Sequence, residues 1–394
     1  RIAGKVRSYE KYTVPEIIGD RYGPVARNLS VFTLVMAYMV IVSYQYNAGG
    51  AVLYTILADN TGTSIISIEL ATIIAAVFII AYTMLAGLLS VAYTDAANSI
   101  IMTLALIISL PILWIKAGSW SGMETAFAAM NKSQHMQFGG VYSAMDIINF
   151  CLPPFLLVIG DANMYQRFSA SKDVQSARHS TTILVFAVLF IELLIIVSAW
   201  VSSSMIPEAE VGKHVLIYAA HQFLPTFLGA IMLTTIVGII ISTADSFLLV
   251  PANTLIRDIY LNYINPQASE KNIVRLSRLL VLLLGIIAYI VSIGFSRSAG
   301  FFERALYAYT IYGAAITPAL VAALFWRGAT KEGAVASIIC GTLITLFWKE
   351  LPGLWFWLPT KWYISLDEVL PAISGSLLAL IGVSYLTQKA DPGK

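Results

Sequence analysis

Four oxygen-bearing side chains lie within five consecutive positions of one long apolar stretch, at Ser242, Thr243, Asp245 and Ser246. On a helix, Ser242, Asp245 and Ser246 share one face, and Thr243 lies beside it. A charged side chain at membrane depth costs about 2.5–3.5 kcal/mol on insertion scales, so an acid there needs a reason. Hydroxyl, carboxylate and carbonyl oxygens suit hard cations. The pattern therefore favours a site for dehydrated Na⁺, whereas a lone serine would more often bond back to its own helix.

Two further acids lie within apolar stretches. Asp95 stands near the start of its stretch, where the helix dipole alone would favour an acid in the first turn. Asp161 comes directly after Gly160 and shortly after Pro153 and Pro154, three residues that should interrupt a helix. Interrupted helices recur at the binding sites of membrane transporters, so Asp161 is a candidate for solute binding. A simple proline kink is the alternative.

Three other polar residues could face a solute. Gln45 and Asn47 lie late in the first long apolar stretch, and Tyr309 belongs to a tyrosine-rich one. Polar packing near the membrane interface explains Gln45 and Asn47 equally well, and a tyrosine stripe is more often packing and interface anchoring. We therefore keep all three as candidate solute ligands beside these alternatives.

The elements that must position these residues are membrane-spanning helices. Hydrophobic residues make up 58% of the 394 residues and charged residues only 12%, whereas a soluble chain carries roughly a quarter charged residues. Apolar runs of about 20 residues can cross the roughly 30 Å hydrocarbon core. We predict an all-α integral membrane protein with a single membrane domain, 1–394. Its ten spans are expected at 27–57, 64–86, 90–116, 142–165, 179–204, 224–250, 278–296, 302–326, 332–349 and 367–388.

The distribution of basic residues predicts the orientation of these spans. An even number of spans places both termini on one side, and most of the 24 lysines and arginines fall in the loops of that side. Basic loops face the cytoplasm. We therefore expect both termini in the cytoplasm of a multi-pass protein of the plasma (inner) membrane. The loops 117–141, 205–223 and 350–366 should then be external.

Charge and motifs disfavour several other functions. The formal net charge is +2, and no run of five or six Lys/Arg occurs, so no nucleic-acid partner is expected. The sequence contains no GxxxxGK[ST] loop, no HExxH and no nucleophile elbow, which would mark nucleotide, zinc or acyl-transfer chemistry. We predict that the protein is not an enzyme and uses no organic cofactor. Its partners would be the lipid bilayer, a small solute and an ion.

Several stretches together resemble the sodium:solute symporter family, which includes proline symporters and sodium/glucose transporters. Each motif is weak by itself, but their order and spacing are specific, and the resemblance covers nearly the whole chain. It implies a five-plus-five inverted-repeat fold of the leucine-transporter type. Family members usually have three spans before the first of these stretches, so the chain resembles a member that lacks its N-terminal spans. The stretches are 13–23, 87–95, 160–168, 242–246 with 256–260, and 312–326.

The resemblance also implies ion ligands. Ser242 and Thr243 match the hydroxyl ligands of the family's common sodium site, with a backbone carbonyl one turn earlier at Ile239. Asp95 matches a carboxylate that serves a second sodium site in some members, together with the positions of Asp245 and Ser246. The family usually has a small or hydroxyl residue where Asp245 stands, so two carboxylates here could strengthen that site or bind a proton instead.

The function implied is sodium-coupled symport of a small polar solute by alternating access. Two alternatives stay open. A proton-coupled carrier would use Asp95, Asp161 or Asp245 as relay groups, and its transport would survive removal of Na⁺. A membrane sensor could keep the fold without transport, and a long soluble signalling extension would favour it. The residues do not identify the solute.

Overall fold

Helices account for the regular structure of the computed structural model over the residues it describes, which are 2–58, 64–85, 88–207, 214–295, 300–348 and 366–388. Within these ranges the only β-type contact is an isolated bridge between Ala58 and Ser64. In lipid, a helix satisfies its backbone hydrogen bonds internally, which is why long apolar stretches adopt it. The all-α class predicted from the sequence is confirmed.

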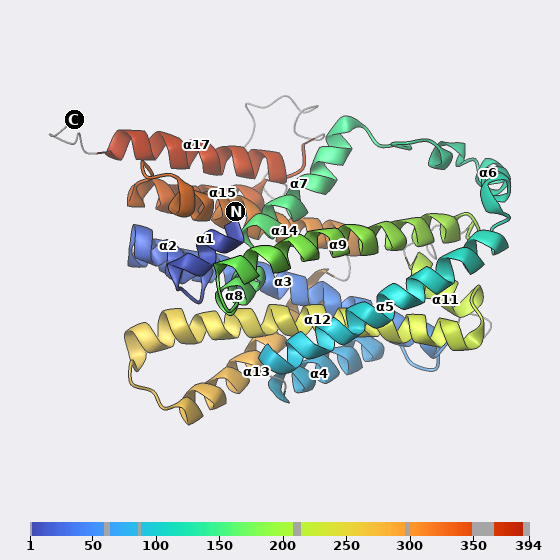
Figure 1. Ribbon diagram of the computed structural model, residues 1–394, viewed down its shortest axis with the longest axis horizontal. Coiled ribbons are helices and arrows are strands. Elements are labelled where there is room, and N and C mark those ends of the chain that lie inside the picture. Colours follow the sequence, from blue (N-terminus) through green and yellow to red (C-terminus); the bar gives the residue numbers. More distant parts are fainter. Residues whose placement is uncertain are drawn as a thin grey trace. The chain divides into compact units, whose positions relative to one another are not determined.

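The helices are shown in Figure 1. In chain order they are α1 (Ile2–Tyr9), α2 (Val14–Tyr22), α3 (Pro24–Ile56), α4 (Ile68–Leu85), α5 (Leu88–Lys116), α6 (Ser119–Ala129), η1 (Ser133–Met136), α7 (Ala144–Gly160), α8 (Ala162–Ser169), α9 (Val174–Ser203), α11 (Val215–Gln222), α12 (Thr226–Thr254), η2 (Leu255–Ile264), α13 (Glu270–Phe295), α14 (Phe301–Phe325), α15 (Lys331–Phe347) and α17 (Val369–Thr387).

Among the described residues, nine helices are long and apolar enough to cross a membrane. The one predicted span that is not among these nine helices is the ninth, 332–349, which forms α15, whose 17 residues are at the short end of the length that spans a bilayer. The sixth span ends later than predicted, because α12 continues without a gap into the π-helix η2 as far as Ile264. Nearly all of the predicted loop 350–366 lies outside the described residues.

The predicted break in the span 142–165 falls at a different residue. Pro153 and Pro154 lie inside α7, which continues to Gly160, and the helix is interrupted at Asp161 before α8 begins. Prolines are tolerated within membrane helices because neighbouring groups can satisfy the carbonyls that they leave unbonded. The prolines therefore do not end the helix, and the break lies where an acid caps the following one.

The chain divides into two compact units, each built from separate stretches. Unit 1 comprises Arg1–Tyr44, Ala144–Ser180 and Phe247–Lys394, and unit 2 comprises Gln45–Ser143 and Thr181–Ser246. The long helices α3, α9 and α12 each contribute residues to both units. The single membrane domain expected for 1–394 stays a prediction.

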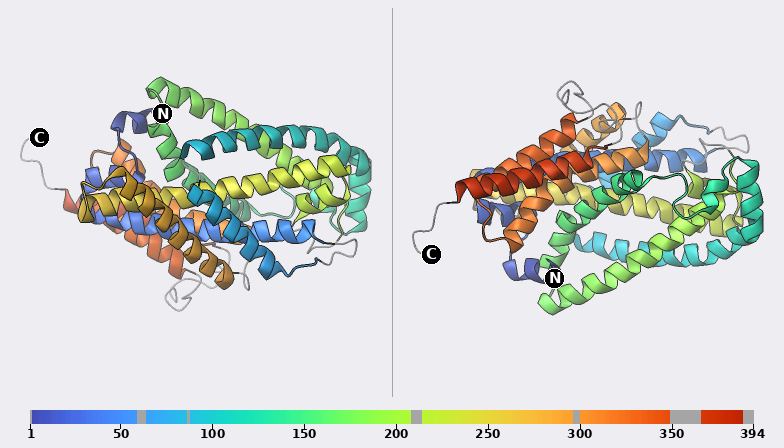
Figure 2. Two further views of the ribbon diagram at one scale, coloured as in Figure 1. Left: turned by 90° about the horizontal axis from the view of Figure 1, so that it is seen from below. Right: turned by 90° about the horizontal axis from the view of Figure 1, so that it is seen from above.

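Unit 1 is built around α14, most of whose residues are buried. α14 packs against α7 and α15, and α15 lies along α17 (Figure 2). Glycines permit the close approach: a Cβ at Gly313 would lie 2.6 Å from Leu156 Cβ, and one at Gly341 would lie 2.6 Å from the backbone oxygen of Ala314. The distances between these helices are therefore fixed by their small residues.

Unit 2 has its own apolar core, to which α5, α6, α9, α11 and α12 contribute. Met123 and Phe127 of α6 are almost completely buried in it. The indole Nε1 of Trp200 donates to the backbone oxygen of His135 at 2.9 Å, and the His135 ring stacks on Phe127 with 5.3 Å between centroids. These contacts fix the connection after α6 against α9.

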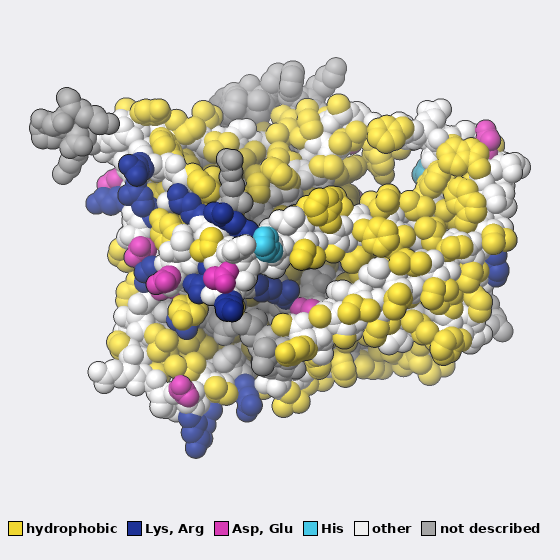
Figure 3. Space-filling model, in the orientation of Figure 1, with side chains coloured by type: hydrophobic (Ala, Val, Ile, Leu, Met, Phe, Trp, Pro, Cys, Tyr) yellow, Lys and Arg dark blue, Asp and Glu magenta, His cyan; other side chains and the backbone are white. Residues whose placement is uncertain are grey.

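The outer faces of the helices are apolar. α9 exposes Ile183, Phe186 and Phe190 with half or more of their surface accessible, and hydrophobic side chains cover most of the helical surface in Figure 3. Lysines and arginines gather in that view near α1 and α2 of unit 1. Lys5 of α1 and Arg21 of α2 are both exposed. Such a surface suits lipid contact along the helices and headgroup contact at their charged ends.

Candidate functional site

The oxygen-rich segment of α12 is joined to α5 by two side-chain contacts within unit 2. The Ser242 hydroxyl donates a hydrogen bond to Oδ1 of Asp95. The amide nitrogen of Asn98, about one turn farther along α5, donates to the backbone oxygen of Gly238 at 3.3 Å. A Cβ at Gly238 would lie 3.1 Å from the Asn98 amide, so the glycine leaves room for this contact.

The oxygen surface continues along α12 beyond Ser242. Asp245 is completely buried and Ser246 is 6% exposed, and the two residues lie three and four positions after Ser242, on the same side of the helix. Asp95 and Ser242 are half-buried. A buried carboxylate is costly unless its charge is compensated. The cluster of Asp95, Ser242, Asp245 and Ser246 supplies carboxylate and hydroxyl oxygens of the kind that a hard cation binds.

The other two predicted sodium ligands lie on the neighbouring face of the same helix. Ile239 and Thr243 are half-buried and are four residues apart, so they stack one turn above the other. α12 is unbroken there, and the Ile239 carbonyl is therefore not freed by any helix interruption. The hydrogen bond from Ser242 to Asp95 links a residue of the first predicted site to one of the second. The division into two sodium sites stays a prediction.

In unit 1, Asp161 organises the broken helix. It is the N-cap of α8, and its Oδ1 accepts hydrogen bonds from the backbone N–H of Asn163 at 3.1 Å and from the Tyr38 hydroxyl at 2.6 Å. The first N–H groups of a helix have no partner within it, and an aspartate at the N-cap supplies one. Tyr38 comes from α3, so this carboxylate ties the start of α8 to a second helix.

The carbonyls at the end of α7 are also satisfied by side chains. The Thr317 hydroxyl donates to Leu156 O at 2.8 Å and the Tyr312 hydroxyl to Gly160 O at 2.7 Å, both from α14. The Tyr165 hydroxyl of α8 donates to the oxygen of Ile159 at 3.0 Å. Together with Asp161, these hydroxyls give the buried interruption of the helix hydrogen bonds that an unsupported break would lack.

The four predicted solute ligands fall into two groups. Asp161 and Tyr309 belong to unit 1, where the Tyr309 hydroxyl lies 3.0 Å from that of Tyr44. Gln45 and Asn47 belong to unit 2 and are half-buried. The Asn47 amide nitrogen is buried and has no hydrogen-bond partner among the described residues. The role of these four residues in solute binding stays a prediction.

Two residues that take part in these contacts were not singled out from the sequence. Asn98 could have been found, because it lies three residues after Asp95 and therefore on the same face of α5. Tyr38 had no comparable signal, since one tyrosine in a long apolar helix is ordinary and its partner Asp161 is 123 residues away.

Comparison with known proteins relates the chain to one family. The model of the sodium:solute symporter family matches residues 1–341. The chain is 26% identical to the sodium/proline symporter of Haemophilus influenzae, over 99% of this chain and 78% of the relative. It is 25% identical to the high-affinity proline transporter PutP of Bacillus subtilis, over 98% and 80%. A sodium/glucose cotransporter of Vibrio parahaemolyticus is 24% identical, over 86% and 67%.

The fold has a counterpart among solved structures. A Na⁺-coupled sialic acid symporter in a substrate-bound, outward-open state superposes with a TM-score of 0.72, covering 98% of this chain and 79% of that one. Its sequence identity is 14%. The likeness is therefore one of fold, and it agrees with the inverted-repeat fold expected from the sequence motifs.

Proposed function

The chain belongs to the sodium:solute symporter family, and we propose that it couples the inward movement of Na⁺ to that of a small polar solute by alternating access. Its relatives are transporters and not enzymes, and with its apolar helices it is an integral, multi-pass membrane protein. In the proposed cycle both ligands bind the outward-facing state, and each raises the population of the state that the other prefers.

One observation supports the ion-binding part of the proposal. The Ser242 hydroxyl of α12 donates a hydrogen bond to the Asp95 carboxylate of α5, and Asp245 and Ser246 lie about one turn farther along α12. Carboxylate and hydroxyl oxygens can replace the water lost by a dehydrated cation. We propose Ser242, Thr243 and the Ile239 carbonyl as one set of sodium ligands. Asp95, Asp245 and Ser246 are the proposed second set.

The broken helix supports the solute-binding part. At the interruption between α7 and α8, the N-terminus of α8 is capped by Asp161, and irregular backbone at membrane depth is tolerated where it lines protein or a cavity. We propose Asp161, Tyr309, Gln45 and Asn47 as residues that face the solute. Tyr38 would then act through Asp161, because its hydroxyl holds that carboxylate at 2.6 Å.

The names of the relatives suggest which solutes to try first. Two of those described above are proline transporters and one is a sodium/glucose cotransporter. We propose an amino acid of the proline type as the first candidate. A sugar is the second, and a sugar acid is the third because the structural neighbour is a sialic acid symporter.

Uptake into proteoliposomes tests the proposal. The full-length protein is reconstituted, and uptake of labelled proline, glucose and sialic acid is compared under an inward gradient of Na⁺ and under one of K⁺. We expect one solute to accumulate only with the Na⁺ gradient. Equal uptake under both gradients would contradict sodium coupling.

Proton coupling is the second candidate, and the burial of Asp245 favours it. A completely buried carboxyl group is a chemically suitable carrier of one proton, and the family usually has a smaller residue at this position. A pH gradient imposed without Na⁺ separates the two candidates. Uptake that follows the pH gradient and is abolished by Asp245→Asn would assign the coupling to a proton.

A further inference from the structure

Three exposed cations of unit 1 lie around the turn between α14 and α15. They are Lys5 of α1, Arg21 of α2 and Arg327 of the turn itself, and we call them the basic surface. Nζ of Lys5 lies 4.9 Å from the centroid of the Phe325 ring at the end of α14. The Arg21 guanidinium donates to the backbone oxygens of Arg327 and Ala329 at 2.7 and 3.4 Å. Cations from three separate stretches of the chain therefore meet at one turn.

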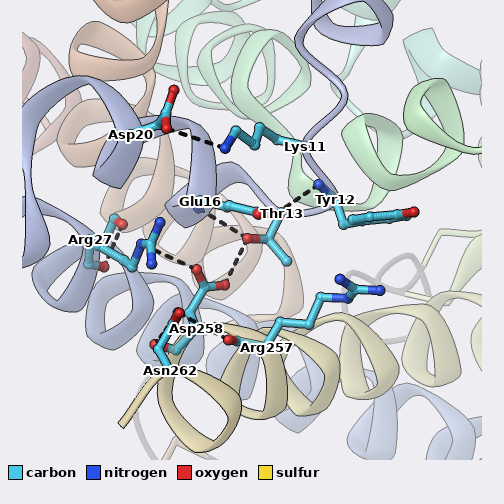
Figure 4. Close-up of polar contacts among 10 residues, drawn as sticks. Lys11, Tyr12, Thr13, Glu16, Asp20, Arg27, Arg257, Asp258 and Asn262 are labelled. Carbon is cyan, nitrogen blue, oxygen red and sulfur yellow. Dashed lines mark hydrogen bonds and ion pairs between the residues drawn. The ribbon is translucent and has the colours of Figure 1, made fainter. Parts of the chain in front are cut away.

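Other cations of unit 1 are neutralised by acids, as Figure 4 shows for two of them. Nζ of Lys11 lies 3.2 Å from Oδ1 of Asp20. Nε of Arg27 lies 3.6 Å from Oδ1 of the buried Asp258. Asp20 directly precedes Arg21 in the chain, so its pairing with Lys11 engages the acid that is nearest to Arg21 in sequence.

The basic surface has no such compensation. Lys5, Arg21 and Arg327 make no ion pair among the residues that the structure describes. Glu332, at the start of α15, is paired with Lys331 at 3.5 Å. Like charges gathered at one place repel one another, and a bound anion relieves that repulsion. The surface therefore suits an anionic partner.

Exposed apolar side chains begin directly beside these cations. Phe325, the last residue of α14, is half exposed. On α17, Leu378, Ile381 and Tyr385 are exposed and recur at spacings of three and four, so they share one face. We call these three residues the α17 stripe. The Tyr385 ring lies 6.3 Å from that of Trp326, so the stripe reaches the same turn.

The turn lies at the edge of the apolar spans. The two candidate spans beside it end at Phe325 on α14 and at Thr387 on α17. The Gln388 amide donates to the backbone oxygen of Gly328 at 2.6 Å, so the two span ends lie at one level. Lysine and arginine at the ends of spans extend toward the lipid headgroups. The basic surface is thus at headgroup level, and the α17 stripe is at the level of the acyl chains.

One kind of molecule matches both features. Inorganic phosphate would contact the cations and leave the α17 stripe unused, and an acidic peptide in water would do the same. An anionic phospholipid carries a headgroup phosphate and acyl chains in one molecule, and basic clusters at a membrane edge attract such lipids. We propose that the basic surface and the α17 stripe form a binding site for an anionic phospholipid. The site depends neither on sodium coupling nor on the identity of the solute.

The fluorescence of Trp326 provides a local measurement of lipid binding, because its ring lies beside Tyr385. The full-length protein is reconstituted in bilayers that contain dibrominated phosphatidylglycerol or dibrominated phosphatidylcholine with the same acyl chains. Bromine atoms quench a neighbouring indole, and the Trp326 contribution is the difference between the wild type and Trp326→Phe. Competition between the two lipids gives their relative binding constant at this site.

We expect the wild type to prefer phosphatidylglycerol about tenfold or more. Each of Lys5→Gln, Arg21→Gln and Arg327→Gln should lower this preference about three- to fivefold, because each removes one cation from the headgroup. The triple variant should bind the two lipids about equally. Raising the KCl concentration should weaken the preference of the wild type, because exposed charges are screened.

Charge-preserving and distant substitutions serve as controls. Arg21→Lys and Arg327→Lys retain the charge and should keep most of the preference, whereas a merely structural role of these arginines would not be rescued by lysine. Lys271→Gln removes an exposed cation from a different helix, α13, and should leave the preference at the wild-type value.

The outcomes are decisive in both directions. At constant ionic strength, replacing chloride by inorganic phosphate should leave the quenching unchanged; if phosphate displaces the brominated lipid, the site binds free anions and the proposal is wrong. Equal binding of both lipids by the wild type, or an unchanged preference in the triple variant, would also overturn it. If the triple variant cannot be reconstituted, the three single variants decide. None of these results bears on sodium coupling, which the uptake experiments test separately.

Discussion

At the scale of single residues, the proposed sodium ligands are tested by removing the side-chain hydroxyls of Ser242 and Thr243. Ser242→Ala and Thr243→Ala should each raise the half-saturating Na⁺ concentration about ten- to a hundredfold, because one charge-assisted contact is worth roughly 1.5–3 kcal/mol. Thr234→Ala on the same helix is the matched control, since the Thr234 hydroxyl is exposed and bonds back to Ala230 O. Na⁺-dependent uptake in proteoliposomes is the measurement. Wild-type half-saturation in both well-folded variants would refute the sodium ligands.

Asp95 supports a second prediction at this scale. Asp95→Asn should weaken the dependence on Na⁺ more than it lowers the maximal solute flux, because the substitution preserves shape and removes the charge beside Ser242. Activation curves for Na⁺ measured at saturating solute are the readout. Unchanged activation curves would show that Asp95 is not a sodium ligand. It would then be an acid near the start of its helix that accepts a hydrogen bond from Ser242.

The sequence predicted the residue types of this site but not their contacts. Ser242, Asp245 and Ser246 were recognisable because they share a helical face in an apolar segment, which a single stretch of sequence displays. The hydrogen bond from Ser242 to Asp95 joins residues that are 147 positions apart in the sequence. Helix periodicity shows which residues share a face of one helix, but it does not show which other helix that face will contact. Tyr38 was missed for the same reason.

At the scale of elements, the interruption between α7 and α8 depends on hydroxyl donors from α14. Tyr312→Phe removes the hydrogen bond to Gly160 O and leaves a buried carbonyl without it, at a cost of about 1–3 kcal/mol. The melting temperature of the detergent-solubilised protein should fall. Tyr385→Phe is the control, because that side chain on α17 is 67% exposed. Equal melting temperatures for the two variants would argue against this support of the break.

Hydropathy predicted the helices well and their ends less well. Long apolar runs cross a membrane whatever they pack against, so nine spans could be located from composition. Their boundaries depend on specific contacts. The break at Asp161 is supported by hydrogen bonds from Tyr38 and Tyr312, which belong to other helices. The π-helical extension to Ile264 contains the buried Asp258, which accepts a hydrogen bond from Thr13. Contacts between residues so far apart in the chain leave no local pattern in the sequence.

At the scale of the whole molecule, the distribution of lysine and arginine predicts the orientation in the membrane. In a variant without the native Cys151 and Cys340, a cysteine placed at Gln222 should react with a membrane-impermeant maleimide from outside. One placed at Gln267 should react only after the membrane is opened. Both glutamines are exposed. The reverse pattern of labelling would overturn the predicted topology.

Sodium-coupled symport is tested most directly by measuring both ligands in one experiment. Proteoliposomes containing the full-length protein are given ²²Na⁺ outside, with and without the transported solute, at constant membrane potential and pH. Symport predicts that the solute accelerates ²²Na⁺ entry and that Na⁺ accelerates solute entry, and that Ser242→Ala weakens both effects while Thr234→Ala leaves them unchanged. Solute entry that is independent of Na⁺, with ²²Na⁺ entry unaffected by solute, would contradict it.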